Sequence, residues 1–233
     1  MHDFWTSTFD GRLILAPVEQ PKEILDIGCG TGLWAMEVAD EFPDCEVYGI
    51  DLAPIQEVYV PQNCTFRLEN VLNGPIFQDE KFDLIQSRCL APGFPDRRWP
   101  DYIAEIWRMT KPLGWIQLIE LDPIRRCDDG SMPVNSALAE YERIAMRVMK
   151  ESYATTIHGA LPRLTRHVQK AGFINIKQID IKTPLGNWTS GSTFVCWSRL
   201  TIRQRRMENR TMYGGTTEVC ETSDSGWHAR MDR

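Results

Sequence analysis

The chain has 233 residues with ordinary hydrophobic and charged fractions (42% and 25%), and its formal net charge is −6 at pH 7. This length is enough for one α/β domain with a sizeable core, and the acidic balance argues against a general nucleic-acid-binding surface. No apolar run reaches the roughly 18 residues of a membrane-spanning helix, so we expect no membrane span.

The cysteines and the N-terminus bear on the cellular compartment. Seven cysteines are scattered without C-x-x-C spacing, which favours reduced thiols and argues against a structural zinc site. The first five residues lack the basic and apolar regions of a signal peptide. We therefore expect a cytoplasmic or nuclear protein with no bound metal and no membrane partner.

Residues 1–22 form the first predicted segment. Its composition is too apolar for a disordered tail, with large side chains at Phe4, Trp5, Phe9, Leu13, Ile14 and Leu15. We expect this segment either to lie as a lid over a ligand site, where it would exclude water, or to pack as ordinary core.

A buried strand that runs into a glycine turn organises the rest of the chain. Residues 24–27 supply the apolar strand, and a helix with an apolar face follows over residues 33–42. Three alternate glycines in residues 28–32 let the backbone turn tightly and approach a ligand. The spacing is G-x-G-x-G, because Leu33 stands where the dinucleotide fingerprint G-x-G-x-x-G has its third glycine.

Two acidic residues flank this turn in the predicted sheet. Asp26 lies two residues before the first glycine, and Asp51 ends a second strand predicted over residues 45–51. A carboxylate at the end of that strand can accept hydrogen bonds from both hydroxyls of a ribose. The pattern indicates a nucleoside-binding site, and its alternatives are another Rossmann-like nucleotide site or a tight turn without function.

The next two strands end in polar residues. The third is predicted over residues 64–71 and the fourth over residues 82–88. Asn70 could accept a hydrogen bond through its amide oxygen, or serve only as a turn residue. Arg88 ends the fourth strand on the ligand side, where its guanidinium could bind both oxygens of a carboxylate. The alternative for Arg88 is a surface arginine paired with a nearby acid.

The remaining elements continue the alternation of helices and strands. The pattern predicts helices over residues 101–109, 135–151 and 161–171, and strands over residues 115–121 and 173–181. Gly172 stands where it would end the last helix. The apolar positions change phase within the last strand, so we expect a β-bulge there.

Asp26, the alternate glycines and Asp51 together resemble the signature of class I S-adenosylmethionine-dependent methyltransferases. The resemblance implies a Rossmann-like three-layer α/β sandwich of the class I methyltransferase type, with S-adenosylmethionine as cofactor. It implies a cofactor site made of Asp26, Gly28, Gly30, Gly32, Asp51, Leu52, Asn70, Val71 and Arg88. Relatives usually place an acid at the position of Asn70, where it accepts from the adenine N6 amine, and this chain departs from that pattern.

A narrower resemblance is to the fungal LaeA-like methyltransferases. It is carried by D-G-R-L and A-P in residues 10–17, by I-L-D-I-G-C-G-T-G-L-W-A and G-I-D-L-A-P-I-Q in residues 24–56, and by later K-P-L-G-W and P-L-G-N-W motifs. It implies methyl transfer to a small-molecule acceptor in fungal secondary metabolism. The alternative is a non-catalytic S-adenosylmethionine-binding protein that regulates this metabolism. Neither the acceptor nor the oligomeric state follows from the sequence.

Few residues could act as a base for methyl transfer. Glu120 ends the fifth strand at the ligand edge, His158 lies in a loop, and His167 lies on the border of a helix. Each also has a structural interpretation, such as a helix N-terminal partner for Glu120, so no catalytic residue is assigned. No Ser-His-Asp order or metal constellation supports a hydrolase or a metalloenzyme.

We divide the chain into a lid segment (1–22), a methyltransferase domain (23–188) and a divergent, disordered tail (189–233). The resemblance stops after Trp188, and the sequence offers no clear candidate for the last strand of the fold. An arginine cluster follows instead, either as a solvated helix face or as a nuclear address, at Arg199, Arg203, Arg205, Arg206 and Arg210. Both ends of the chain favour a divergent or misassembled reading frame.

Overall fold

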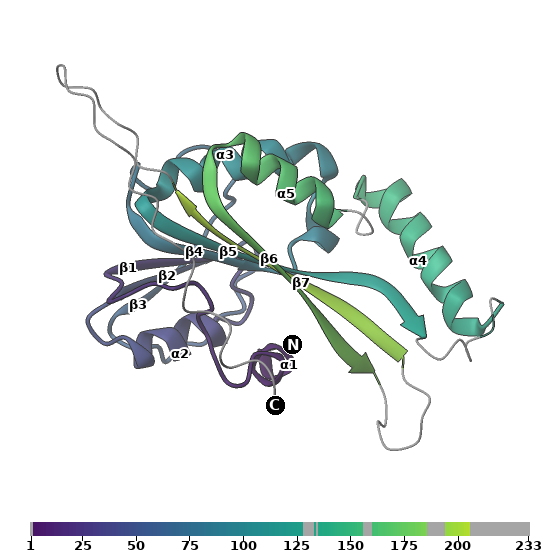
Figure 1. Ribbon diagram of the computed structural model, residues 1–233. Helices are drawn as coiled ribbons and strands as arrows, with labels where there is room; N and C mark the ends of the chain where they lie inside the picture. The colour runs from purple at the N-terminus through teal and green to yellow at the C-terminus, as the bar shows by residue number, and fades with distance from the viewer. Residues whose placement is uncertain (1, 128–132, 134, 156–159, 186–193, 206–233) are drawn as a thin grey trace.

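The computed structural model describes residues 2–127, 133, 135–155, 160–185 and 194–205, which form a seven-stranded sheet with helices on both faces (Figure 1). The helices are α1 (His2–Thr8), α2 (Leu33–Glu41), α3 (Trp99–Met109), α4 (Ala137–Tyr153) and α5 (Ala160–Lys170), with short 3-10 turns η1 (Ala91–Gly93) and η2 (Asp96–Arg98). The strands are β1 (Glu23–Ile27), β2 (Glu46–Asp51), β3 (Cys64–Leu68), β4 (Phe82–Arg88), β5 (Thr110–Cys127), β6 (Phe173–Leu185) and β7 (Phe194–Arg205).

The order of the strands places a ligand site at the middle of the sheet. It is β3-β2-β1-β4-β5-β7-β6, and β1 pairs in parallel with β2 on one side and with β4 on the other. The chain therefore changes direction across the sheet between β1 and β4, and open α/β sheets bind ligands beyond the carboxyl ends of strands at such a switch point. This architecture confirms the predicted Rossmann-like three-layer α/β fold.

Two hydrophobic clusters, one on each face of the sheet, hold the three layers together. α3 and α5 cover one face, where Tyr102 and Val168 are buried, and α1 and α2 cover the other (Figure 1). Along β4, Leu84 packs into the α2 cluster and the next residue, Ile85, into the α3 cluster. A strand that is buried on both faces reads as a continuous apolar run, which is why the sequence pattern located it.

The N-terminal segment packs on the α2 face of the sheet. Trp5 is 1% exposed and stacks on Phe9, with 5.5 Å between the ring centroids. The indole N–H of Trp34 donates to the carbonyl oxygen of Leu13 at 3.0 Å. The segment is therefore bound to α2 through buried rings and a hydrogen bond, and it adds to the core.

The last part of the sheet differs from its predicted bounds. β5 begins at Thr110 and extends to Cys127, beyond both ends of the predicted strand 115–121. In β6 the pairing register shifts between Ile174 and Lys177, where Asn175 has a φ of 52°. The change of hydrophobic phase predicts a bulge between Ile176 and Ile179, so a bulge is present in this strand but begins two residues earlier than expected.

The expectation that the last strand is missing is wrong. β7 lies between β5 and β6 and runs antiparallel to both, within the region that the sequence assigned to a disordered tail. Arg199, Arg203 and Arg205 belong to this strand and not to a helix face, whereas Arg206 and Arg210 lie outside the described residues.

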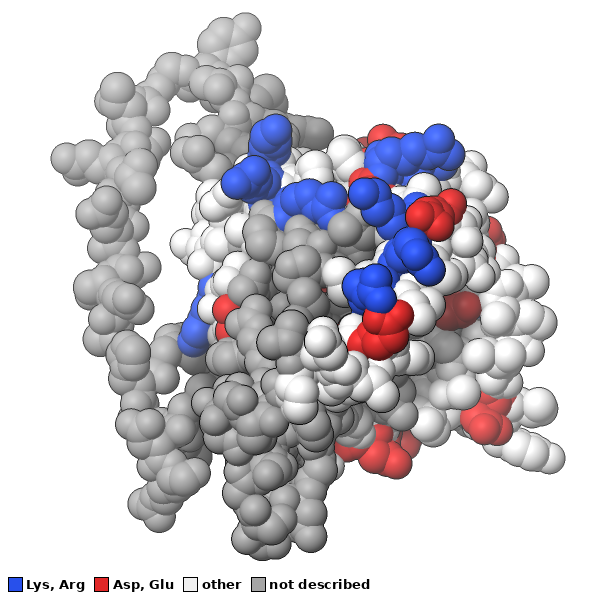
Figure 2. All heavy atoms as spheres, turned by 90° about the vertical axis from the view of Figure 1, so that its right-hand side faces the viewer, with Lys and Arg blue, Asp and Glu red and all other residues white. Residues whose placement is uncertain are grey.

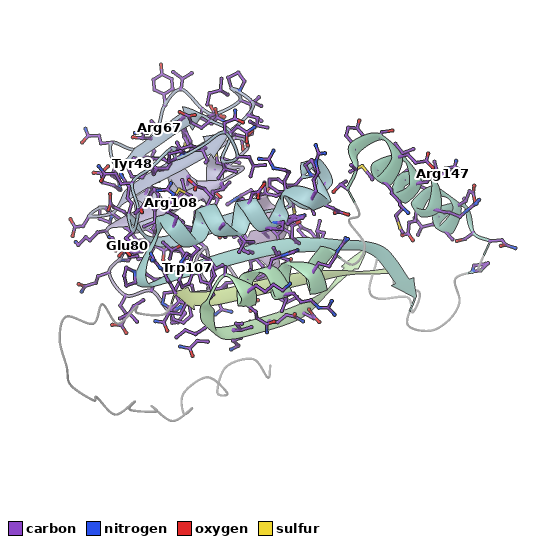
Figure 3. All side chains as sticks on the ribbon, turned by 90° about the horizontal axis from the view of Figure 1, so that it is seen from above. Tyr48, Arg67, Glu80, Trp107, Arg108 and Arg147 are labelled. Atoms are coloured by element: carbon purple, nitrogen blue, oxygen red, sulfur yellow. The ribbon has the colours of Figure 1, made fainter. Side chains whose placement is uncertain are left out.

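Arg205 shows how an arginine is accommodated in the sheet. It is 5% exposed, its guanidinium carbon lies 4.7 Å from the ring centroid of Trp107, and it pairs with Glu80 at 3.0 Å. It also donates to the carbonyl oxygen of Thr110. Trp107 and Glu80 lie beside the end of β7 (Figure 3). The charge is thus compensated by partners that are distant in sequence.

α4 projects from the body of the molecule, beyond the ends of β5 and β7 (Figures 1 and 3). None of its residues is buried. Figure 2 shows several Lys and Arg side chains on the side of the molecule that α4 occupies. Among the described residues, no helix is long and apolar enough to cross a bilayer.

Candidate functional site

The glycine turn follows β1 directly, at the switch point of the sheet. Gly28, Gly30 and Gly32 have φ values of 71°, 57° and 83°, a region that strongly favours glycine. A Cβ at Gly28 would lie 2.4 Å from Leu90 Cδ2, and one at Gly32 would lie 2.3 Å from Phe66 Cζ, whereas one at Gly30 would meet no atom within 4 Å. The outer glycines are therefore closed in by neighbouring side chains, and the middle one faces open space where a ligand can approach.

Asp51 connects the end of β2 to this turn. Its Oδ2 accepts a hydrogen bond from the backbone N–H of Gly30 at 2.8 Å, and its Oδ1 accepts from the N–H of Ala53 at 3.0 Å. Each carboxylate oxygen can accept a second hydrogen bond. The carboxylate can therefore hold the turn and still accept from two ligand hydroxyls. Leu52 follows it with a side chain that is 69% exposed.

Gln56 is a residue of this site that sequence reasoning missed. Its amide Nε2 donates to the carbonyl oxygens of Gly30 at 2.8 Å and Ala53 at 2.9 Å. It thereby ties the glycine turn to the segment after β2. The only signal in the sequence is its place in the motif G-I-D-L-A-P-I-Q, which does not indicate what the amide binds.

Asp26 is a buried acid with an unused acceptor. It is 2% exposed, and its Oδ2 makes no hydrogen bond of regular geometry among the described residues, although the Gln86 amide on the neighbouring strand faces it. Burial raises the pKa of Asp26 to about 7, while the positive charge of Arg88 and the amide of Gln86 oppose this shift. A buried acceptor without a partner is costly, so a ligand that brings a donor or a positive charge would be stabilised there.

Arg88 ends β4 on the same face as Asp26. Its guanidinium carbon lies 5.9 Å from the ring centroid of Trp34, and it lines a small pocket with residues of the N-terminal segment. Among the described residues, no carboxylate forms an ion pair with Arg88. This arrangement favours the interpretation of Arg88 as an anion-binding residue over that of an arginine paired with a nearby acid.

Asn70 and Val71 follow β3 in a turn. The amide Oδ1 of Asn70 accepts from the backbone N–H of Leu72 at 2.9 Å, and its carbonyl oxygen accepts from Asn73 at 3.0 Å. Val71 is 7% exposed and packs in the α3 cluster. The turn role considered for Asn70 is therefore present, and a role of either residue toward a ligand stays a prediction.

The candidate bases differ in their surroundings. Glu120 is 3% exposed, and its carboxylate accepts from the backbone N–H groups of Leu90 at 2.9 Å and Ala91 at 3.2 Å. Burial raises the pKa of Glu120 to about 8. These bonds anchor the start of η1, which fits the structural interpretation. His167 lies in α5, where burial lowers its pKa, and His158 lies outside the described residues.

The structure thus brings the predicted residues of β1, β2, β3 and β4 to the carboxyl ends of adjacent parallel strands. Among the described residues, no group of three His, Cys, Asp or Glu side chains is arranged to hold a metal. This geometry suits a nucleoside, because a glycine turn lies next to a carboxylate with free acceptor positions, and charged residues, Asp26 and Arg88, lie on the two strands at the switch point.

Comparisons with known proteins also point to a site for a nucleoside cofactor. A family model for a methyltransferase domain matches residues 24–114. "Secondary metabolism regulator LAE1" of Cochliobolus heterostrophus is 35% identical over 194 residues, which cover 80% of this chain and 62% of the relative. "Methyltransferase pytC" of Aspergillus terreus is 33% identical over 190 residues (81% and 57%). "Protein-methionine methyltransferase laeA" of Emericella nidulans is 33% identical over 186 residues (79% and 49%).

The chain spans about half to three fifths of the length of these relatives. Among solved structures, human N-acetylserotonin methyltransferase in complex with S-adenosylmethionine is similar with a TM-score of 0.57 and 16% identity, over 87% of this chain and 53% of that one. At this identity the likeness shows the fold. The chain therefore belongs to the class I S-adenosylmethionine-dependent methyltransferases and to their LaeA-like group, and the predicted cofactor, S-adenosylmethionine, is that of its family.

Proposed function

We propose that this chain binds S-adenosylmethionine at the glycine turn and transfers its methyl group to a small-molecule acceptor of fungal secondary metabolism. The observation that carries the proposal is the open Gly30, whose backbone N–H is held by the carboxylate of Asp51 at the end of the neighbouring strand. A cofactor with a ribose and a narrow thioether chain fits this arrangement, because Asp51 keeps acceptor positions for the hydroxyls and the chain needs a surface without side chains, while the buried carboxylate of Asp26 could pair with the ammonium.

The other residues fit the remaining parts of the cofactor. Asp51 has acceptor positions for the ribose hydroxyls, and the exposed side chain of Leu52 offers an apolar surface for the adenine ring. Asn70 and the backbone N–H of Val71 would lie toward the edge of the adenine. The guanidinium of Arg88 would bind the carboxylate at the methionine end.

Methyl transfer requires the protein mainly to align the acceptor with the cofactor. The bound cofactor supplies a methyl group on a positively charged sulfur, which is intrinsically reactive. The chain must position the acceptor in line with this methyl group and exclude water. Glu120 is occupied by two backbone donors, so the proposed reaction uses an acceptor that is already nucleophilic at neutral pH.

Calorimetry and label transfer test the proposal. We expect saturable heat when the purified protein is titrated with S-adenosylhomocysteine, and none with a nicotinamide dinucleotide. Incubation with methyl-labelled cofactor and a fungal extract should then place label in the small-molecule fraction. Absence of heat with S-adenosylhomocysteine would refute the site, and label found only in protein would refute the small-molecule acceptor.

The second candidate is a non-catalytic cofactor-binding regulator, active in the cytoplasm or the nucleus. It is favoured by the engagement of Glu120 with η1, which leaves that acid unavailable as a base, and by relatives whose names describe regulators of secondary metabolism. It predicts binding of S-adenosylhomocysteine without label transfer to any fraction. The two experiments together therefore separate the two candidates.

A further inference from the structure

α4 projects from the body of the molecule (Figures 1 and 3), and its C-terminal end is anchored there. Thr155, the second residue after the helix, is 1% exposed. Its hydroxyl oxygen lies 2.8 Å from the carbonyl oxygen of Ala91 and 2.7 Å from that of Phe94. The backbone N–H of Asp96 donates to the carbonyl oxygen of Ala154 at 3.1 Å. These contacts with the region of η1 and η2 hold one end of α4 in place.

The helix itself is specified by local signals. Ser136 caps its first turn, because its hydroxyl oxygen accepts from the backbone N–H of Ala139 at 3.2 Å. Glu140 and Arg143 form an ion pair about one turn apart. Helices in proteins nevertheless gain most of their stability from the packing of an apolar face, and none of the residues of α4 is buried. Among the described residues, this packing is therefore incomplete.

Three large apolar side chains form an exposed stripe along α4. Tyr141 is 62% exposed, Ile144 is 42% exposed and Val148 is 44% exposed. Their spacing of three and then four residues places them on one face of the helix. Single exposed apolar residues are normal on protein surfaces, but a stripe with this spacing is the pattern by which one helix packs against another. The stripe therefore indicates a helical partner.

The charges beside the stripe indicate which helix this partner is. Glu140 and Arg147 are seven residues apart, so they stand in one row on the same side of the stripe. Arg147 is exposed on the projecting helix (Figure 3), and the side chain of Glu140 is 50% exposed. Both hydrogen bonds from Arg143 reach Oε2 of Glu140, which leaves Oε1 for a further donor. The row thus offers one acid and one base to a partner.

Two antiparallel copies of α4 satisfy these charges. When a two-fold axis relates two identical helices, the row on one side of the stripe meets the same row of the second copy in the reverse direction. Glu140 then faces Arg147 of the second copy, and Arg147 faces Glu140 of the second copy. In a parallel pair the row would face the other side of the stripe, where Ala145 offers no charge. The charges therefore favour an antiparallel pair of identical helices.

We propose that α4 is a dimerisation helix, through which two copies of this chain associate with their α4 helices antiparallel. The two stripes pack on one another, with Tyr141 of each copy between Ile144 and Val148 of the other. At 1.5 Å per residue the helix is about 25 Å long, so a single helix pair buries less surface than a standard interface. The dimer is therefore weak and in equilibrium with the monomer, and the charge pairs determine its orientation more than its affinity.

Sedimentation velocity on the full chain tests the association. With rising protein concentration, the mass should increase from that of the monomer, 26.8 kDa, toward twice this value. Ile144→Gln combined with Val148→Gln should raise the dissociation constant of the dimer by about tenfold or more, because the apolar contact is lost. Glutamine is a good helix former, so circular dichroism and thermal denaturation should show that this variant is folded like the unaltered chain.

Exchange of the two charges tests the antiparallel orientation. Glu140→Arg alone, or Arg147→Glu alone, should weaken the dimer, because each places like charges opposite one another. A mixture of the two variants should form a mixed dimer, since every residue 140 then faces the opposite charge at residue 147. The double variant Glu140→Arg, Arg147→Glu should associate with itself again for the same reason.

Lys150→Glu is the matched control, because it changes the charge by the same amount at an exposed position of α4 outside the row. It should dimerise as the unaltered chain does, and it should not rescue Glu140→Arg in a mixture. An unaltered chain that stays monomeric at every concentration would overturn the proposal. So would a dimer that the glutamine variant does not weaken, or a mixture of Glu140→Arg and Arg147→Glu that fails to associate.

Discussion

Asp51 accepts a hydrogen bond from the backbone N–H of Gly30, so the acid at the end of β2 holds the middle glycine of the turn after β1. The two residues are 21 positions apart and belong to the motifs that carry the family resemblance. The same carboxylate that is expected to bind the ribose therefore also fixes the shape of the turn. This double role determines what its removal should do.

Asp51→Ala should weaken the binding of S-adenosylhomocysteine by about 2 kcal/mol, because hydrogen bonds to a charged acceptor are lost. The variant also loses the bonds from Gly30 and Ala53, so the turn loses part of its support. Calorimetry measures the affinity, and Asp79→Ala serves as a control because Asp79 is a surface acid paired with Arg108. Unchanged affinity in Asp51→Ala would remove this residue from the cofactor site.

Gly30→Ala and Gly32→Ala should affect the protein in different ways. A methyl group at Gly32 would collide with the ring of Phe66 at 2.3 Å, so Gly32→Ala should lower the melting temperature strongly. At Gly30 the methyl group enters open space, and the cost to stability is limited to the positive φ of 57°. Gly30→Ala should therefore remain folded and lose cofactor binding.

Thermal denaturation and calorimetry on the two variants measure these effects. A Gly30→Ala variant that binds S-adenosylhomocysteine normally would show that the ligand does not approach the turn at its middle glycine. A Gly32→Ala variant with an unchanged melting temperature would contradict the contact with Phe66.

The pKa of Asp26 makes stability depend on pH. In the folded protein this pKa is raised to about 7 by burial, from an ordinary value of 3.8, so the folded state holds a proton that the unfolded state has released. Stability should therefore fall as the pH rises from about 4 to about 7, and level off above that. Glu120, with a pKa raised to about 8, acts in the same direction.

Asp26→Asn isolates the contribution of Asp26. Urea denaturation between pH 5 and pH 8 should show that the free energy of unfolding of this variant changes less with pH than that of the unaltered chain. The reason is that, of these two acids, only Glu120 then lowers the stability as the pH rises. Binding of S-adenosylhomocysteine to the unaltered chain should strengthen as the pH rises through about 7, because the ammonium requires the ionised carboxylate. Identical pH profiles for the two proteins would contradict the raised pKa.

The sequence predicted the first half of the fold well because its signals are local. β1, the glycine turn, α2 and β2 are specified by apolar periodicity and by glycines that stand next to one another in the chain. The structure places each of their predicted elements within a few residues of the expected bounds. The predicted site residues of these elements lie at one edge of the sheet for the same reason.

The buried amides and β7 were not predictable by the same means. Gln86 and Gln117 look like ordinary polar residues of a strand, and only the packing of residues 15 and 16 across β5 shows that they form a chain of hydrogen bonds. β7 pairs with strands whose residues are far away in sequence. In the sequence its arginines therefore indicate an exposed polar segment, because the groups that bind them in the fold are distant in the chain.

Arg205→Ala should destabilise the protein by about 2 kcal/mol, because it leaves the buried carbonyl oxygen of Thr110 without that donor and removes a cation from the face of Trp107. Glu80, the ion-pair partner, has a side chain that is 44% exposed and can return to water, so the ion pair itself adds little. Arg205→Lys keeps the charge but cannot reproduce the planar stacking, and should lose about half as much. Arg166→Ala, on α5 outside this cluster, is the control, and urea denaturation measures all three. If Arg205→Ala were as stable as the control, β7 would not be anchored to α3 by this arginine, and its place between β5 and β6 would depend on backbone pairing alone.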